Sequence, residues 1–270
     1  MHPIVNIKTR SIVITGSTRG IGFSLAMAFL ERDCAITISG RTQEAVNEAI
    51  EKLGVKYSPE LIFGYACNVT DYIQLQKLWE NAKGHFGRID IWINNAGMAT
   101  PMMKFCEHTP DRYADVVQTN ILGTMYGTKV ALTEMLAQGH GALYNLEGFG
   151  ARGRSMHGMT LYGSTKASIH FINQSLAQET EGTPVITGAI APGMVITDMI
   201  TQQFEGREQE LEKSKRILNI IAERAETVAP VLAKKILENH KNGVTISFSS
   251  PARMMLKFLS APFTKRDLFS

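Results

Sequence analysis

Two residues one helical turn apart, Tyr162 and Lys166, carry side chains suited to proton transfer. The surrounding sequence predicts a helix over Thr160–Thr180, on which positions i and i+4 share a face. A phenol has a pKa of about 10 and is a poor acid at neutral pH, but a nearby ammonium group favours the phenolate. The pair could exchange a proton with a substrate oxygen, although the same spacing also occurs in exposed surface pairs.

A glycine-rich segment near the N-terminus is typical of a phosphate-binding loop. It lies between a predicted strand, Ser11–Thr15, and a predicted helix, Ile21–Arg32. Gly16 permits the tight turn, Gly20 lets the backbone approach a pyrophosphate, and Gly22 allows close packing of helix and strand. Free N–H groups at the start of the helix favour anions. The alternative is a tight turn without a ligand.

The residues after the second predicted strand, Ala35–Ser39, indicate which dinucleotide the loop would bind. An acidic residue there would hold the ribose 2′-hydroxyl of NAD, but the strand is followed by Gly40 and Arg41. Arg41 and Arg19 could instead bind the 2′-phosphate of NADP, because guanidinium groups match phosphate oxygens. The sequence therefore predicts NADPH/NADP+ as the cofactor, unless both arginines are only solvated.

Short apolar runs alternate with helical segments along the chain, a pattern typical of βαβ units. We expect one doubly wound α/β domain of the Rossmann type over residues 1–270, with a seven-stranded parallel sheet. Residues 198–239 are expected to form a helical lid, interrupted near Ala225, and residues 251–270 a basic, apolar extension. The predicted strands are Ser11–Thr15, Ala35–Ser39, Leu61–Ala66, Ile89–Ile93, Ala142–Leu146, Pro184–Ala191 and Val244–Phe248. The other predicted helices are Thr42–Leu53, Asp71–Phe86 and Asp111–Ala137.

The composition narrows the class of protein. Hydrophobic residues make up 44% and charged residues 20% of the 270 residues, as in soluble globular proteins. A net charge of +3 without a basic run argues against nucleic acid as a partner. No apolar run is long enough for a transmembrane helix, and the cysteines and histidines lack metal-binding spacing. Without a signal peptide, we expect the bacterial cytoplasm, or the plastid stroma if a transit peptide has been removed.

Three further motifs occur in register with the tyrosine and lysine: Asn94-Asn95-Ala96-Gly97, Asn120 and Pro192-Gly193. With them, the sequence resembles the short-chain dehydrogenase/reductase family over nearly its whole length. The resemblance implies that Tyr162 is the acid/base, that Lys166 binds the nicotinamide ribose, and that Asn120 holds a relay water. It also implies a homo-oligomer, a dimer or tetramer, paired through the helices that hold Asn120 and Tyr162. The implied cofactor contacts are Gly16, Ser17, Thr18, Arg19, Gly20, Ile21, Gly22, Arg41, Asn68, Val69, Asn95, Ala96, Gly97, Tyr162, Lys166, Pro192, Gly193, Val195 and Thr197.

One departure from the family concerns catalysis. The family normally has a serine at the end of the fifth strand, where this chain has Glu147 and Gly148. The loss of one such donor typically costs about 3–4 kcal/mol of transition-state stabilisation. Three explanations are open. Catalysis could have been lost, or Ser155 or Thr160 could supply the hydroxyl. In the third, the acidic residue and the glycine are native to a subfamily with its own substrate.

The chlorophyll b reductases of this superfamily have an acidic residue followed by glycine at this place. The sequence is similar to them there, in Tyr162-Gly163-Ser164-Thr165-Lys166, and in the segment after residue 218. This resemblance implies NADPH-dependent reduction of the C7 formyl group of chlorophyll b, a step of chlorophyll catabolism. A general carbonyl reductase and a non-catalytic NADP-binding scaffold are the alternatives.

Three features remain open in the sequence. Glu147 either donates a hydrogen bond to an oxyanion or pairs with Arg152 or Arg154 in the loop. Residues 251–270 either dock on a membrane surface, where a lipophilic pigment resides, or pack on the domain. Several methionines either form an adaptable apolar mouth for a chlorophyll-type pigment or fill the core. They are Met98, Met102, Met103, Met156, Met159, Met194 and Met199.

Overall fold

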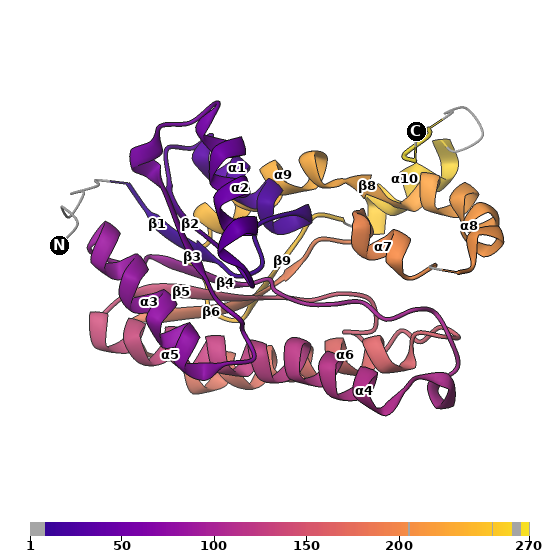
Figure 1. Cartoon of the computed structure of the whole chain (residues 1–270), viewed down its shortest axis with the longest axis horizontal. Helices are drawn as coiled ribbons and strands as arrows, with labels where there is room; N and C mark the ends of the chain where they lie inside the picture. Colours follow the sequence, from indigo (N-terminus) through magenta and orange to yellow (C-terminus); the bar gives the residue numbers. More distant parts are fainter. Residues whose placement is uncertain (1–8, 205, 250, 261–265, 270) are drawn as a thin grey trace.

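A seven-stranded parallel sheet forms the centre of the protein, with the strand order β3-β2-β1-β4-β5-β6-β9 (Figure 1). The computed structural model describes residues 9–204, 206–249, 251–260 and 266–269. The sheet confirms the predicted doubly wound α/β domain. The strands are β1 (Ser11–Ile14), β2 (Ala35–Gly40), β3 (Ile62–Ala66), β4 (Ile91–Asn94), β5 (Gly141–Leu146), β6 (Val185–Ala191) and β9 (Val244–Ser247).

Helices cover both faces of the sheet (Figure 1). One layer contains α1 (Gly20–Leu30), α2 (Gln43–Gly54) and α9 (Ala225–Leu237). The other contains α3 (Tyr72–Phe86), α5 (Gly123–Gln138) and α6 (Thr160–Glu179). Parallel strands joined by crossover helices are buried on both faces, which is why β1, β2 and β4 are continuous buried runs.

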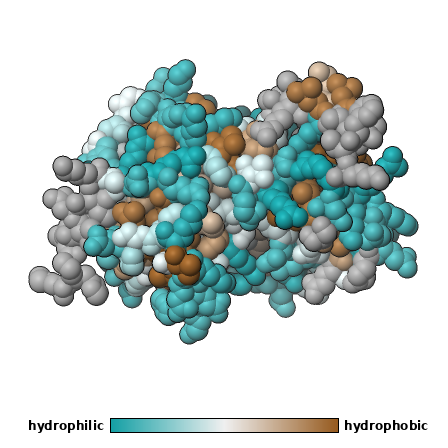
Figure 2. Space-filling model, turned by 90° about the horizontal axis from the view of Figure 1, so that it is seen from above, coloured by the Kyte–Doolittle hydropathy of each residue, from teal (hydrophilic) through white to brown (hydrophobic). Residues whose placement is uncertain are grey.

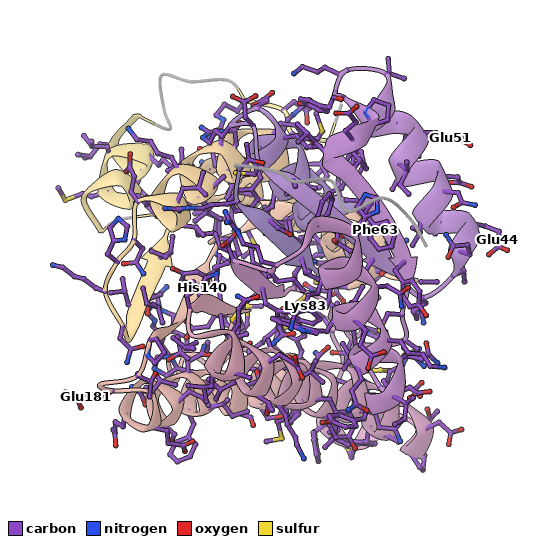
Figure 3. All side chains as sticks on the ribbon, turned by 90° about the vertical axis from the view of Figure 1, so that its left-hand side faces the viewer. Glu44, Glu51, Phe63, Lys83, His140 and Glu181 are labelled. Atoms are coloured by element: carbon purple, nitrogen blue, oxygen red, sulfur yellow. The ribbon has the colours of Figure 1, made fainter. Side chains whose placement is uncertain are left out.

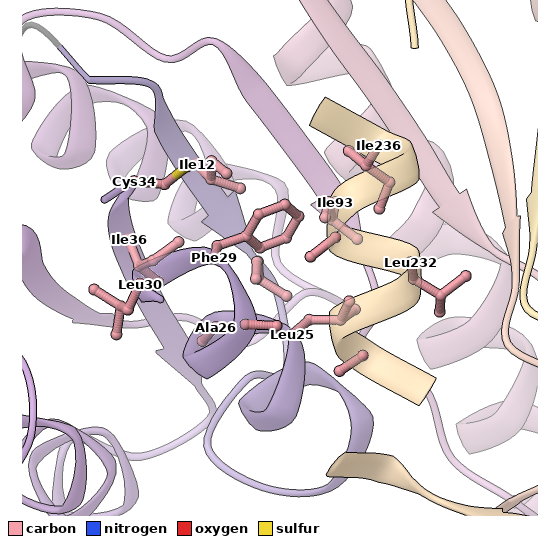
Figure 4. Close-up of a cluster of buried hydrophobic side chains, with 14 of the residues drawn as sticks. Ile12, Leu25, Ala26, Phe29, Leu30, Cys34, Ile36, Ile93, Leu232 and Ile236 are labelled. Carbon is pink, nitrogen blue, oxygen red and sulfur yellow. The ribbon is translucent and has the colours of Figure 1, made fainter. Parts of the chain in front are cut away.

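Local sequence explains where these helices begin and which side they bury. Asp71, the first residue of the predicted helix, is the N-cap of α3 and accepts hydrogen bonds from the amides of Ile73 (2.9 Å) and Gln74 (3.2 Å). On α2, Val46 is buried, whereas Glu44 and Glu51 point away from the sheet (Figure 3). The α1 and α9 helices enclose an apolar core in which Phe29, Leu232 and Ile236 pack over Ile12 and Ile93 (Figure 4).

The region predicted as one helix from Asp111 to Ala137 differs from the prediction. It consists of α4 (Pro110–Val117), a π-helical turn (Gln118–Leu122) and α5. The wider turn inserts one extra residue into the hydrogen-bonding ring. Asn120 lies in the middle of this turn.

The predicted lid also differs in its details. It contains α7 (Asp198–Gln202), α8 (Glu208–Ile221) and a short strand, β8 (Glu223–Arg224), that pairs with β7 (Val195–Ile196). The following helix, α9, packs in the core against α1, whereas α7, α8 and β8 of the predicted lid lie beyond the sheet (Figure 1).

The ends of the chain are described in part. The C-terminal extension contains α10 (Pro251–Ser260), while the predicted features at residues 1–8, 261–265 and 270 lie outside the described residues. In the described part of the chain, no helix is long and apolar enough to cross a membrane, and no group of three or more His, Cys, Asp or Glu residues could hold a metal ion. Short 3₁₀ turns lie at Pro59–Leu61 and Phe105–Glu107.

The packing of α2 predicts unequal effects of two matched substitutions. Val46 is fully buried, and an added Cβ on Gly64 of β3 would lie 2.6 Å from its Cγ1, so the helix and strand are in close contact. Val46→Ala is expected to lower the free energy of unfolding by about 2 kcal/mol. Val55→Ala, at a side chain that is 89% exposed, is expected to change it by less than about 0.5 kcal/mol. Urea denaturation measures both, and equal losses would contradict this packing.

Candidate functional site

The glycine loop after β1 has a backbone that only glycine fits well. Gly16 and Gly20 have φ angles of +62° and +59°, in the left-handed region. A Cβ on Gly16 would lie 2.8 Å from Ala96 Cα, and a Cβ on Gly22 would lie 2.5 Å from Asn95 Nδ2. The loop therefore packs directly on the segment that follows β4.

Hydrogen bonds join these two segments. The Thr15 hydroxyl oxygen accepts from the amides of Asn95 and Ala96, both at 3.1 Å. The Asn95 amide group donates to the carbonyl oxygens of Thr15 and Gly16, both at 2.8 Å. Ser17 binds β2 in the same way, because its hydroxyl accepts from the Ser39 amide at 2.9 Å. The predicted cofactor loop is thus fixed to both neighbouring strands.

The start of α1 is suited to an anion. Arg19 is the N-cap residue, no side chain caps the helix, and its first turn contains no acidic residue. Arg19 and Arg41 are exposed, and no carboxylate stands at the end of β2. Arg19 lies 3.9 Å from Asp198, but both side chains are about two-thirds exposed and the pair is weak. The start of α1 is therefore suited to a pyrophosphate, and the two arginines are suited to a further phosphate on the ribose.

Asn68 and Val69 follow β3 at the same edge of the sheet. The side-chain oxygen of Asn68 accepts from the Thr70 amide at 3.2 Å, which closes a local turn. Asn68 is one of the cofactor contacts that the family resemblance implies. Val69 is buried against Gly123, where an added Cβ would lie 2.8 Å from Val69 Cγ2.

Tyr162 and Lys166 are buried together at the start of α6. They are therefore not the exposed surface pair that their spacing also allowed. Their exposed fractions are 7% and 4%. The Lys166 ammonium donates to the Leu146 carbonyl oxygen at 3.2 Å and lies 5.8 Å from the centroid of the Tyr162 ring. Burial raises the pKa of Tyr162 to about 12 and lowers that of Lys166 to about 8, and the negative charge of Glu147 opposes the change at Lys166.

Asn120 lies within the π-helical turn and is fully buried. Its side-chain oxygen accepts from the Met98 amide (2.8 Å), and its amide group donates to the Met98 carbonyl (3.0 Å) and the Thr165 hydroxyl (3.1 Å). A Cβ on Gly97 would lie 3.3 Å from Asn120 Oδ1 and 3.8 Å from Lys166 Nζ. Gly97, Asn120 and Lys166 therefore converge from three different segments.

The residue that faces the Tyr162 hydroxyl is Gly148. A Cβ on Gly148 would lie only 2.5 Å from that hydroxyl oxygen. Ser155 and Thr160, the two other hydroxyls considered from the sequence, are exposed, and neither bonds to Tyr162 within the described residues. A glycine therefore occupies the place next to the phenol.

Glu147 follows β5 and directs its carboxylate toward α6, and the residue is only 3% exposed. It lies 2.7 Å from His170 Nδ1, 3.5 Å from Asn173 Nδ2 and 3.6 Å from Arg152 Nε. The pairing with Arg152 agrees with one of our two alternatives. The sequence reasoning missed His170, although its spacing of four residues from Lys166 places both on one face of α6.

The segment after β6 reaches the glycine loop. Pro192 is buried, Gly193 has a φ angle of +80°, and a Cβ on Gly20 would lie 3.6 Å from Thr197 Cγ2. Val195 is buried in β7, beside β8. The predicted cofactor residues from four segments thus lie at the carboxyl edge of the sheet, where doubly wound folds bind ligands.

The C-terminal extension packs on the lid. Glu223 of β8 contacts Lys257 of α10 at 2.8 Å and Arg266 at 2.5 Å. Burial would raise the pKa of Glu223, but the hydrogen bonds from these two cations outweigh it, and the pKa is lowered. The Leu268 amide also donates to Asn219 of α8 at 2.9 Å. Lys257 of α10 and the segment 266–269 are therefore both attached to the lid.

Comparisons with known proteins agree with this geometry. The family model described as short chain dehydrogenase matches residues 10–208. The "Probable chlorophyll(ide) b reductase NYC1, chloroplastic" of Arabidopsis thaliana is 30% identical over 93% of this chain and 53% of its own length. The "Chlorophyll(ide) b reductase NOL, chloroplastic" of the same plant is 34% identical over 84% of this chain and 65% of its own length. The chain thus spans about half to two-thirds of the length of these curated relatives.

A solved structure is similar as well. The structure described as "ElxO with NADP Bound" is 27% identical, has a TM-score of 0.77, and covers 89% of this chain and 97% of its own. The fold, the buried tyrosine and lysine, and the match over residues 10–208 lead to one conclusion: the chain belongs to the short-chain dehydrogenase family.

Proposed function

We propose that this protein uses NADPH to reduce the C7 formyl group of a chlorophyll b-type pigment to a hydroxymethyl group. Gly148 beside the Tyr162 hydroxyl is the observation that carries the proposal. The identity of 30–34% with chlorophyll(ide) b reductases supports the same substrate. The family assignment itself supports only an oxidoreductase that acts on a small molecule.

The absence of a side chain at Gly148 favours a formyl group as the substrate. A formyl carbon carries one carbon substituent and is less hindered and more electrophilic than a ketone carbon. Its reduction therefore needs less polarisation from a second hydrogen-bond donor. Tyr162 would be the side-chain donor at the carbonyl oxygen, with the small residue leaving room beside it.

The chain's own residues would act in the following way. The glycine loop and the start of α1 would hold the pyrophosphate, and Arg19 and Arg41 would hold the 2′-phosphate. NADPH, when bound, supplies a hydride to the formyl carbon. Tyr162 donates its phenolic proton to the carbonyl oxygen, and the Lys166 ammonium stabilises the phenolate that remains. The burial of both side chains strengthens their interaction, because little water screens it.

The loops around the site fit a large apolar substrate. The Met102 amide donates to the Gln203 carbonyl at 3.0 Å, which ties the loop after β4 to the lid. Except for the buried Met159, the methionines that we expected at the mouth are at least partly exposed. Methionine side chains adapt to flat or irregular apolar surfaces. We infer that these loops contact the ring of the pigment.

Two surfaces support contacts with larger partners. On α10, Met255, Leu256, Phe258 and Leu259 are between 50% and 64% exposed, and Figure 2 shows an apolar patch over this end of the molecule. We propose that α10 rests on the surface of a pigment-containing membrane, in a plastid or a photosynthetic bacterium.

The exposed apolar side chains of α5 and α6, such as Phe171, would form a homo-oligomer interface. Flotation with lipid vesicles and sedimentation velocity test these contacts, and a monomer that remains in the aqueous fraction would contradict both.

The substrate is tested by incubating the purified protein with NADPH and chlorophyllide b. The absorption spectrum is expected to change to that of the 7-hydroxymethyl product, and Tyr162→Phe is expected to slow this conversion about 10²–10⁴-fold because the proton donor is lost. Tyr57→Phe, at a remote tyrosine that bonds to Glu31, is the matched control. Turnover of simple carbonyls without any change in the pigment would refute the proposed substrate and favour a general carbonyl reductase.

The role of Gly148 yields a second prediction. Gly148→Ser restores the residue type that the family normally has, yet we expect it to lower kcat by about tenfold or more. The added Cβ would lie 2.5 Å from the Tyr162 hydroxyl and would force the phenol or the loop to move. Gly84→Ser on α3, where an added Cβ meets no atom within 4 Å, is the matched control. A rise in kcat in Gly148→Ser would show that the site lacks only the serine hydroxyl.

A further inference from the structure

We propose that Glu147 is a positioning residue: its buried carboxylate provides the counter-charge for the Lys166 ammonium, and His170 and Arg152 hold it in place. The inference rests on the proposed function only where it gives Lys166 a part in carbonyl reduction. It assigns Glu147 no contact with the substrate oxygen.

The position of Lys166 brings its charge close to Glu147. The ammonium donates to the carbonyl oxygen of Leu146, the residue directly before Glu147. Lys166 and His170 are one turn apart on α6, and His170 Nδ1 lies 2.7 Å from the carboxylate. The exposed fractions of Glu147 and Lys166 are only 3% and 4%. Two opposite charges are therefore buried next to one strand end.

A chain of hydrogen-bonded neutral side chains holds the Glu147 carboxylate in place. The Asn173 amide group lies 3.5 Å from Glu147, and its oxygen accepts from Asn145 at 2.7 Å. Asn145 in turn accepts from Asn94 at 2.8 Å, and Asn94 accepts from the Trp92 indole at 2.8 Å. This connected network makes other orientations of the carboxylate costly, because each buried polar group would lose a partner.

The charged groups near the Glu147 carboxylate come from α6 and from the loop after β5. Lys166 and His170 face it from α6, and Arg152 faces it from the loop. On the side of β6 and β9, a cavity of about 30 Å³ is lined by uncharged residues such as Ala189 and Thr245. Lys235 of α9 and Glu238, directly after α9, line a second recess with Arg152. Arg152 is 56% exposed, so water weakens its effect.

The energetic consequence concerns the proton of Lys166. Burial lowers the pKa of Lys166 to about 8, and the charge of Glu147 opposes this change. Without Glu147 the pKa would fall further, because a buried ammonium without a counter-charge favours its neutral form. Since lysine loses its proton as the pH rises through its pKa, activity that needs the ammonium would be lost at a lower pH.

The first test follows Lys166 directly in the cofactor-free protein. The Lys166 signal, labelled with ¹³C at Cε and identified by its absence in Lys166→Met, is titrated by NMR. In Glu147→Gln we expect the titration to move to lower pH by about one unit or more. Glu147→Asp keeps the charge and is expected to stay near the parent protein, and Glu179→Gln, at an exposed acid on α6, is the control. An unchanged titration in Glu147→Gln would overturn the inference.

Activity supplies a second readout. With any carbonyl that the enzyme reduces, the alkaline limb of the pH–rate profile is expected to move to lower pH in Glu147→Gln but not in Glu147→Asp. A residue that only supports the fold would lower the rate without moving this limb. The NMR titration needs no substrate, so it tests the role of Glu147 even if the pigment assay fails. An unchanged Lys166 titration would refute the inference even if the pigment is reduced.

A third experiment applies if Glu147→Gln folds but is strongly destabilised. Removing the second charge as well, in Glu147→Gln with Lys166→Met, is expected to restore part of the stability that the single change removes. Two charges that compensate each other show this coupling in a double-mutant cycle. Additive losses in thermal unfolding would contradict a counter-charge role for Glu147.

Discussion

The cost of burying the Lys166 ammonium is the constraint on which the rest of the site depends. A charge with 4% exposure needs partners that replace water, and this chain supplies the Leu146 carbonyl and the negative charge of Glu147. Both partners come from the end of β5, so α6 must pack with its first turns against that strand end. The hydrogen-bond network from Glu147 to Trp92 fixes the position of the Glu147 carboxylate.

A second constraint is the close approach of backbone segments at the carboxyl edge of the sheet. Gly16, Gly22 and Gly148 each lie where a Cβ would meet another atom at 2.8 Å or less. The hydrogen bonds between Thr15 and Asn95 then fix the phosphate-binding part relative to the segment that leads to Gly97. The two halves of the site are therefore positioned by the sheet itself, and side chains at the mouth can differ without disturbing them.

The sequence allowed the order of strands and helices to be predicted, because buried parallel strands are continuous apolar runs and the helices have amphipathic periods. The π-helical turn at Gln118–Leu122 could not be predicted, since five residues are too few to distinguish its period from that of an α-helix. The packing of α9 in the core was also missed. Its apolar face, including Leu232 and Ile236, suits a lid as well as a core in a sequence pattern.

The candidate site was predictable to a similar extent. The spacing of the glycines, and the spacing of Tyr162 and Lys166, allowed these residues to be identified from the sequence alone. The surroundings of Glu147 could not be read in the same way, because a strand end does not reveal which face its next side chain takes. His170 becomes visible as a partner only when β5 and α6 lie side by side.

The attachment of the C-terminal extension to Glu223 has a mechanical consequence. Because β8 is paired with β7, and Glu223 is bound by Lys257 and Arg266, the lid cannot swing away from the sheet without carrying α10 along. The lid, the strand pair and the final helix would therefore rotate as one rigid arm, with Gly193 at its base. A force on the exposed face of α10 would be transmitted along this arm to Thr197, which lies beside Gly20 of the glycine loop.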